Sequence, residues 1–546
     1  MFKKIITGKS KTIVSAAVVI GAASLASRFL GLFRDRILAG TFNAGTELDI
    51  YFAAFRLPDL VYNLLVLGAL SAGFIPVFVG YINNHTCTKD NKEAWRLANN
   101  ILNILAIALV CLCLILIIFA PLLVKIVAPG FTGEQSIITT KMIQIMMASP
   151  ILLGLSSVFG GILQSFKRFF IYSLAPIFYN IGIIIGALYF VKFWGIYGLA
   201  WGVVFGASLH FINQMAASFF LGYRYKKIID LKDRGTRKIL KMMPPRTLTL
   251  AVTQINLLVI TAIASTLKDG SISIFNFANN LQGFPIGIFG VSFAIAVFPT
   301  LSELAAQNNK EEFIKNFSIT FRQILFFVIP ISFFLIVLRA QTVRIVYGTG
   351  KFDWNSTILT MNTLAFFCLS LFSQSLSPIL VRGFYAYHDS RTPLYVAIIG
   401  VCVNIILSLF FTSYFNLGVI GLALAFSVAS WCNMGLLFLT LRMKMKRLDG
   451  RKISWTAAKI VFAAATATFV AQIYKFIIGP ITGTETLIRL LLQASIVGAI
   501  GFWVYGALCW ILRVEEIFVF FASLKRKFLR LKHLQAVNIR EEEDLS

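Results

Sequence analysis

Two arginines and an aspartate stand at the end of the first long apolar run of the chain. Arg28, Arg34 and Asp35 follow a run that begins near Thr12 and is typical of a membrane helix. A charge deep in a bilayer costs about 2.5–3.5 kcal/mol on insertion scales, so such residues are candidates for a functional site. Arg28 and Asp35 are seven positions apart and share a helix face, whereas Arg34 lies off it. Position alone leaves two readings of Arg28, a cavity residue or an anchor that snorkels to the interface.

The second apolar run carries a polar stripe. Asp49, Arg56 and Asn63 are spaced by sevens and predict one polar helix face about 21 Å long. Such a face should meet other protein segments or a water-filled cavity. The alternative is a structural ion pair between Asp49 and an arginine of the first helix. Pro58 falls inside this stripe and is expected to bend the helix.

A third polar group lies in the predicted eighth helix, and it consists of amides followed by glycines and a proline. Its members are Asn276, Asn279, Asn280 and Gln282, then Gly283, Pro285, Gly287 and Gly290. Gly283 and Pro285 predict a bent or broken helix, which transporters place at substrate sites. The glycines equally suit close packing of helices.

No catalytic set accompanies these residues. The longest loops hold no paired carboxylates, no nucleophile elbow and no glycine-rich phosphate loop. The seven cysteines include no C-x-x-C pair, and the four histidines are scattered. We therefore expect no enzyme, no metal site and no cofactor.

The composition shows what kind of protein must position these side chains. Of 546 residues, 58% are hydrophobic and 13% are charged, whereas a soluble domain carries about 25% charge. The mean hydropathy is +0.81. Because a span needs about 20 apolar residues, the sequence predicts an all-α polytopic membrane protein of about fourteen transmembrane helices.

The formal net charge of +27 comes from short basic loops between the apolar runs. This is the positive-inside pattern, which favours anionic membrane lipids over nucleic acid as the neighbour and places both termini in the cytoplasm. The longest basic loop runs from Gly222 to Arg246. A basic amphipathic stretch, Lys525 to Lys532, is expected to lie on the inner leaflet.

Two motifs occur twice and indicate an internal repeat. Leu163–Phe166 parallels Val381–Phe384, and Gly195–Ala200 parallels Gly418–Ala423, each at a helix boundary. Chance similarity of apolar helices is the alternative. The repeat predicts two pseudo-symmetric six-helix lobes followed by a C-terminal helix pair, an arrangement in which transporters hold substrate between the lobes. The predicted segments are an N-lobe (1–222), a basic cytoplasmic linker (223–246), a C-lobe (247–442), helices 13 and 14 (443–513) and a basic tail (514–546).

Several stretches together resemble the MurJ (MviN) family, the lipid II flippases of the MOP superfamily, which also holds the MATE exporters. They are Ser27–Asp35, Asp49 with Ala54–Pro58, Gly68–Phe78, Phe284–Pro285 through Pro299, and Arg382–Ala386 with Asp389–Pro393. The match extends over most of the first twelve predicted helices. For helices 13 and 14 it rests on position and hydropathy alone.

The resemblance implies a V-shaped transporter whose cationic central cavity takes the diphosphate and sugar headgroup of lipid II. Helices 13 and 14 then form a groove for its polyprenyl tail. The residues that this implies for substrate binding are Arg28, Arg34, Arg56, Asn63 and Asn280; Asp35 and Asp49 are charge partners or gating residues, and Pro58, Gly283 and Pro285 bend helices. A diphosphate diester carries about two negative charges, which arginine forks suit.

The sequence also departs from the family pattern. Many members have arginines where Tyr62, Asn63 and Asn280 stand, and Leu67 replaces a nearby acid. Ile260 occupies what looks like the place of a sodium-binding acid. The predicted cavity is therefore less cationic than in those members.

The leading hypothesis is a flippase that carries lipid II from the inner to the outer leaflet of a bacterial cytoplasmic membrane by alternating access. We expect lipid II, anionic lipids and other cell-wall synthesis proteins as partners. One alternative is a flippase for another polyprenyl-linked glycan, or a MATE-like exporter. Another is a membrane scaffold that docks cell-wall enzymes through its basic loops.

Overall fold

The computed structural model describes residues 13–67, 70–83, 92–242, 244–483 and 486–522, and every regular element among them is helical. The predicted amphipathic tail, Lys525 to Lys532, lies outside these residues. The helices of the first half are α2 (Ile13–Phe42), α3 (Thr46–Val61), η1 (Tyr62–Leu67), α4 (Leu70–Asn83), α5 (Lys92–Ile118), α6 (Ala120–Val127), α7 (Gly133–Met146), α8 (Ala148–Ser165), α9 (Phe169–Ile185), η2 (Gly186–Phe190), α10 (Val191–Trp194), α11 (Tyr197–Phe220) and α12 (Arg234–Met242).

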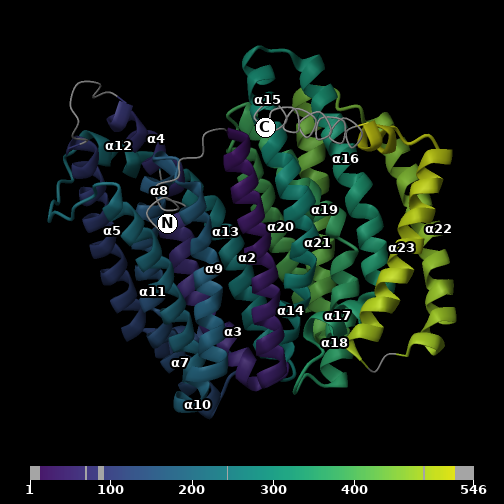
Figure 1. Ribbon diagram of the computed structural model, residues 1–546, viewed down its shortest axis with the longest axis horizontal. Helices are drawn as coiled ribbons and strands as arrows, with labels where there is room; N and C mark the ends of the chain where they lie inside the picture. The colour runs from purple at the N-terminus through teal and green to yellow at the C-terminus, as the bar shows by residue number, and fades with distance from the viewer. Residues whose placement is uncertain (1–12, 68–69, 84–91, 243, 484–485, 523–546) are drawn as a thin grey trace, which may run out of the picture. The chain divides into compact units, whose positions relative to one another are not determined.

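The second half is also helical, and Figure 1 labels most of its elements. They are α13 (Pro244–Ser265), α14 (Ser271–Pro285), η3 (Ile286–Val291), α15 (Ser292–Ala306), α16 (Lys310–Val337), α17 (Arg339–Tyr347), α18 (Trp354–Cys368), α19 (Leu371–Ala386), α20 (Arg391–Leu409), η4 (Phe410–Tyr414), α21 (Gly418–Met445), α22 (Gly450–Thr482) and α23 (Leu487–Ile511).

The prediction of an all-α polytopic membrane protein is confirmed. Among the described residues, ten helices are long and apolar enough to cross a membrane, or eleven when the bent pair α18 and α19 is one span. These membrane-span candidates do not include α2, the α3–α4 pair or α13. The count of fourteen therefore stays a prediction.

Four π-helices support the predicted repeat. η1 interrupts the second predicted helix of the first half, and η3 interrupts the second predicted helix of the second half. η2 and η4 likewise lie near the C-terminal end of the fifth predicted helix of each half. Each is followed by a glycine at positive φ, Gly195 (+55°) and Gly418 (+56°), which is the first residue of the repeated motif. A side chain rarely adopts this backbone conformation, so glycine suits both turns.

The chain forms two compact units. Unit 1 comprises residues 1–281, 346–366 and 394–429, and unit 2 the remainder. These boundaries do not coincide with those of the predicted lobes, which stay a prediction.

Close backbone packing holds α9 and α11 together in unit 1. A Cβ built on Gly182 would overlap the backbone of Gly206, and one on Gly186 would overlap that of Gly202. Small residues that let helix backbones approach are typical of membrane interfaces, where apolar burial no longer drives association. This packing fixes two of the helices that carry the candidate site.

The basic linker is held against unit 1 by buried asparagines of α5. Asn100 donates to the carbonyl of Asp230 and accepts from its N–H, at 2.7 and 2.6 Å. Asn99 likewise donates to the carbonyl of Arg224 and accepts from the N–H of Lys226, and Asn103 donates to the carbonyls of Lys226 and Ile228. The first part of the linker is therefore held in place by asparagine side chains, which bind its backbone N–H and C=O groups.

In unit 2, α16 packs against α15, α19 and α22, and α22 runs beside α23 (yellow in Figure 1). A buried arginine joins these elements. Arg322 of α16 pairs with Glu516 and Glu515, which follow α23, and Lys452 of α22 lies 2.9 Å from Glu515. A buried charge requires such partners because removing it from water is costly.

Candidate functional site

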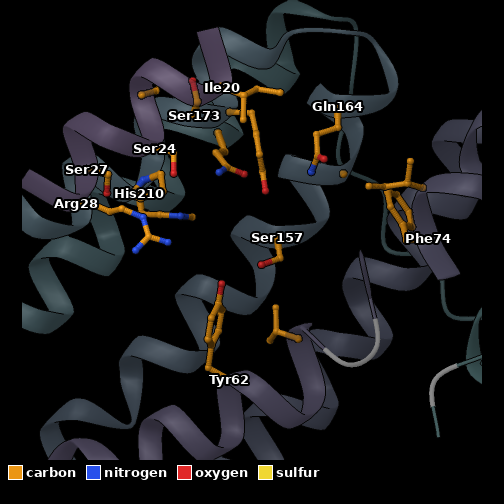
Figure 2. Close-up of a pocket in the computed structure, with 17 residues that line it drawn as sticks. Ile20, Ser24, Ser27, Arg28, Tyr62, Phe74, Ser157, Gln164, Ser173 and His210 are labelled. Atoms are coloured by element: carbon orange, nitrogen blue, oxygen red, sulfur yellow. The ribbon is translucent and has the colours of Figure 1, made fainter. Parts of the chain in front are cut away.

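Six helical elements of unit 1 line a polar cavity of about 470 Å³ (Figure 2). Its walls come from α2, η1 with α4, α8, α9 and α11. Arg28 projects into it, and among the described residues that line the cavity Arg28 is the one with a fixed charge. Hydroxyl, amide and imidazole groups make up the rest of its polar lining: Ser24, Ser27, Tyr62, Ser157, Gln164, Tyr172, Ser173, His210 and Gln214.

The guanidinium of Arg28 is available to a ligand. The side chain is exposed, and no carboxylate of the described residues forms an ion pair with it. Around it stand neutral donors and acceptors. A site of this composition can bind a polar molecule that carries negative charge, because an arginine fork binds phosphate oxygens and hydroxyl or amide groups bind sugar or peptide.

The π-helix η1 places Tyr62 in the cavity wall. Pro58, four residues earlier, cannot donate to the helix ladder, and the backbone then widens into π geometry over Tyr62–Leu67. The Tyr62 hydroxyl points toward Ser157 of α8 (Figure 2). Asn63 is turned to its own helix, where its amide donates to the carbonyl of Asp59 at 2.8 Å. The cavity wall therefore contains Tyr62, which is not a member of the predicted stripe, and does not contain the stripe residue Asn63.

Two residues of α11 complete the inner wall. His210 Nδ1 lies 2.7 Å from the hydroxyl of Ser156, which fixes the ring. Gln214 is 2% exposed, and its side-chain oxygen has no hydrogen-bond partner. A buried acceptor without a partner is unusual and is satisfied when a donor enters the cavity. Sequence reasoning missed both residues, because they share no short spacing with Arg28.

Arg34 and Asp35 form an ion pair with N–O distance 2.7 Å, and Asp35 is only 2% exposed. Arg34 also donates to Asn180 of α9 at 3.1 Å. The second oxygen of Asp35 accepts from the amide of Asn280 in α14 at 2.8 Å. Arg34 and Asn280 are thus engaged in holding helices together.

Arg56 and Asp49 connect α3 to the helices that follow the linker. Arg56 donates to Thr261 of α13 at 2.7 Å and to Asn276 of α14 at 2.8 Å. Asp49, 3% exposed, accepts from the N–H of Gly270 and from the N–H and hydroxyl of Ser273, at 2.6–2.7 Å. The carboxylate therefore caps the N-terminus of α14, where the helix dipole favours negative charge.

These bonds belong to a larger set, which we call the seam: the hydrogen bonds that join residues 35–56 to residues 261–280 and 346–356. Besides those of Asp35, Asp49 and Arg56, the seam includes Thr46 with Asp269, Gly40 with Lys351, Arg36 with Val346, and Asn43 with Ser356. Its members come from both predicted lobes, and all lie within unit 1.

The seam and the cavity occupy different levels of the same helices. On α2, cavity residues extend from Ile20 to Arg28 and seam residues begin at Asp35. Along α3 and η1 the order along the chain is reversed: Thr46, at the start of α3, belongs to the seam, and Tyr62, at the start of η1, lines the cavity. Both helices therefore place the seam toward the turn between them, and the cavity toward the end at which α2 begins.

The predicted bend in helix 8 lies in unit 2. Pro285 ends α14, and η3 follows it directly. A Cβ on Gly283 would meet open space, whereas one on Gly290 would overlap Ser375 of α19. Pro285 thus lies where the α-helix changes to a π-helix. Of the two glycines, Gly290 is the one that packs closely against a neighbouring helix.

Comparisons with known proteins identify the family. The family model described as "Lipid II flippase MurJ" matches residues 38–489. A probable lipid II flippase MurJ of Buchnera aphidicola subsp. Schizaphis graminum is 31% identical over 438 residues, covering 79% of this chain and 84% of the relative. The chain belongs to the MurJ family. A probable MurJ flippase of Rhizobium tropici is also 31% identical, over 445 residues covering 79% of this chain and 81% of that one.

Solved structures agree with this family assignment. A structure of lipid II flippase MurJ in an inward closed conformation matches with a TM-score of 0.75 and 26% identity, covering 92% of this chain and all of that one. An inward-facing MATE transporter of the MOP superfamily matches with a TM-score of 0.65 and 16% identity, over 79% of this chain and 98% of that one, and so shares the fold. The protein is a multi-pass membrane protein of a transporter family, as predicted. Its relatives are named as flippases, not as enzymes.

Proposed function

We propose that this protein flips lipid II from the inner to the outer leaflet of the bacterial cytoplasmic membrane by alternating access. Membership of the MurJ family supports this proposal. The observation that carries it is the contrast among the arginines. Arg34 and Arg56 are used in contacts between helices, whereas Arg28 lines a polar cavity and has no ion-pair partner among the residues that the structure describes.

The chemistry of the cavity suits a lipid-linked sugar diphosphate. Arg28 binds a phosphate oxygen pair, and the surrounding hydroxyl and amide groups, Gln214 among them, bind the sugar and peptide. Of the three arginines that the resemblance implied, Arg28 alone is among the lining residues described for the cavity, since Arg34 binds Asp35 and Asn180 and Arg56 binds Thr261 and Asn276. The predicted asparagines are engaged as well, Asn63 with its own helix and Asn280 with Asp35. Neutral donors therefore make up much of the headgroup recognition.

The seam acts as the outer gate of this transporter. The basic N-terminus places the start of α2 in the cytoplasm, so the cavity lies on the cytoplasmic side of the seam. A closed seam corresponds to a state that receives the headgroup from the cytoplasm. Release to the outside then requires the contacts of Asp35, Asp49 and Arg56 to break together, as two packed arrangements exchange.

The test replaces Arg28 in cells that depend on this protein for flipping. Arg28→Gln should abolish the exposure of lipid II at the outer surface, measured by its cleavage with an externally added lipid II hydrolase. Arg28→Lys keeps the charge without the fork and should retain part of the activity. Lys227→Gln, which removes an exposed charge from the linker, serves as the matched control. Normal exposure in the Arg28→Gln variant, at equal membrane level, would contradict the proposal.

A further inference from the structure

A second cavity lies at the basic ends of α21 and α22 in unit 2. It has a volume of about 1180 Å³, and five cations line it. They are Arg442, Lys446, Arg447, Arg451 and Lys452. Phe438, Leu448 and Trp455 supply apolar walls. It shares no residue with the Arg28 cavity.

The positive charge of this cavity is largely unmatched. Asp449 is the one acid among its lining residues, and it lies 3.9 Å from Arg447. Lys452 pairs with Glu515 outside the cavity. In the part of the chain that the structure describes, Arg442 and Arg451 have no carboxylate partner. Five cations gathered around one hollow repel one another, so the arrangement favours an anion in it.

The start of α22 adds to this preference. Its first residues line the cavity, and the side chain of Asp449 does not cap the helix. The first intrahelical bond of this 33-residue helix runs from the N–H of Ile453 to the carbonyl of Asp449, so the N–H groups before Ile453 lie at the positive end of the helix dipole, beside the arginines.

The cavity lies at the depth of lipid headgroups. From Trp455 an exposed aromatic ridge continues along α22 at steps of seven residues, through Phe462, Phe469 and Phe476, with exposed fractions of 60–71%. On α21, Met443 is 72% exposed. Such faces on membrane-spanning helices contact lipid chains, and a tryptophan at their end marks the interface. The basic cavity thus opens where lipid phosphates lie.

We propose that this cavity binds the phosphate headgroup of an anionic phospholipid of the cytoplasmic leaflet, with Arg442 and Arg451 as principal phosphate ligands. Its acyl chains lie against the ridge that begins at Trp455. Basic pockets between membrane helices on the cytoplasmic side recognise lipid phosphates through such contacts. The volume accommodates a whole headgroup, and neither residue is needed for the seam or the Arg28 cavity.

The experiment counts lipids on the intact protein. Full-length protein, delipidated in detergent, is titrated with phosphatidylglycerol and its bound states are resolved by native mass spectrometry. The variant is R442Q/R451Q, and the control is K227Q/K238Q, which removes two exposed charges from unit 1. We expect the variant to lose the tightest phosphatidylglycerol site, with binding weakened about 30-fold for two lost cation contacts, and the control to keep it.

Two further arms identify the source of the phosphate. Phosphatidylcholine should bind the wild type and the variant equally, because it carries no net charge. Undecaprenyl diphosphate tests the other lipid phosphate in this membrane. If its binding depends on Arg442 and Arg451 while that of phosphatidylglycerol does not, the assignment to a phospholipid is overturned. Equal phosphatidylglycerol binding by wild type and variant overturns it as well. Unchanged elution on size exclusion shows that the variant is folded.

Discussion

Asp49 offers the sharpest test of the seam. The carboxylate accepts three hydrogen bonds from Gly270 and Ser273 and is 3% exposed. Asp49→Asn keeps the shape of the side chain but replaces one carboxylate oxygen by an NH₂ group. This donor then faces another donor, the N–H of Gly270 or the N–H and hydroxyl of Ser273. Hydrogen bonds to charged groups contribute about 1.5–3 kcal/mol each and neutral ones about 1. We therefore expect the closed seam to lose about 3 kcal/mol.

This loss can be measured as a change in how often the seam opens. Ala44 is 7% exposed and lies against Gly270 in the seam. In a variant without the seven native cysteines, A44C reports opening, because a membrane-impermeant maleimide added outside reacts only when the seam parts. A loss of about 3 kcal/mol predicts labelling about 100-fold faster in A44C/D49N than in A44C.

A graded control separates the carboxylate from its surroundings. Ser273→Ala removes one of the three donors to the charged carboxylate and should accelerate labelling about tenfold, for a loss of about 1.5 kcal/mol. If Asp49→Asn leaves the labelling rate unchanged, Asp49 does not hold the seam closed and the gate reasoning is refuted. Equal acceleration by both variants would also contradict the calculation, since the charge would then add nothing.

Two further predictions concern unit 2. Arg322→Leu leaves Glu516 buried without its cation, and should destabilise the protein by about 3–5 kcal/mol; a thermal shift assay should show most of this recovered in R322L/E516L, and a single variant as stable as the double one would refute the ion-pair argument. Partial burial disfavours the charged form of Asp389, but hydrogen bonds from Lys444 and Thr392 outweigh it and lower the pKa of this carboxyl. Its contribution is therefore present above about pH 4 and is lost as pH falls through the lowered pKa. The fall in melting temperature between pH 6 and pH 3.5 should be smaller in Asp389→Asn, and an equal fall would contradict this.

The membrane class could be predicted from physical rules that act locally, whereas the two-lobe repeat and the role of Arg28 in substrate binding stay predictions. The length of an apolar run predicts a membrane span. An arginine inside such a run indicates a candidate functional site, whichever helices it contacts in the fold. Gly195 and Gly418, which open the two copies of the predicted repeat motif, both occupy turns with positive φ. These features depend on a residue and its near neighbours.

The partners across the seam could not be predicted in this way. Asp49 was expected to pair with an arginine of the first helix, or to serve as a gating residue. In the structure it caps α14 through Gly270, more than two hundred residues away, and its gating role stays a prediction. Asn63 shares a stripe with Arg56, but the π-helix that begins at Tyr62 rotates the positions after it. Helix register beyond such a bulge depends on packing, so strict spacing by sevens fails there.

The most direct test of the account is to lock the seam. Thr46 and Asp269 bond through their side chains at 2.7 Å across it. In the variant without native cysteines, T46C/D269C places two thiols at this contacting pair, so that they can be cross-linked by oxidation or by a short bifunctional thiol reagent that a reductant cleaves. The account predicts that oxidation abolishes lipid II exposure at the outer surface and that a reductant restores it, because the gate must open in each cycle. Undiminished exposure in the fully cross-linked protein would contradict alternating access through this seam.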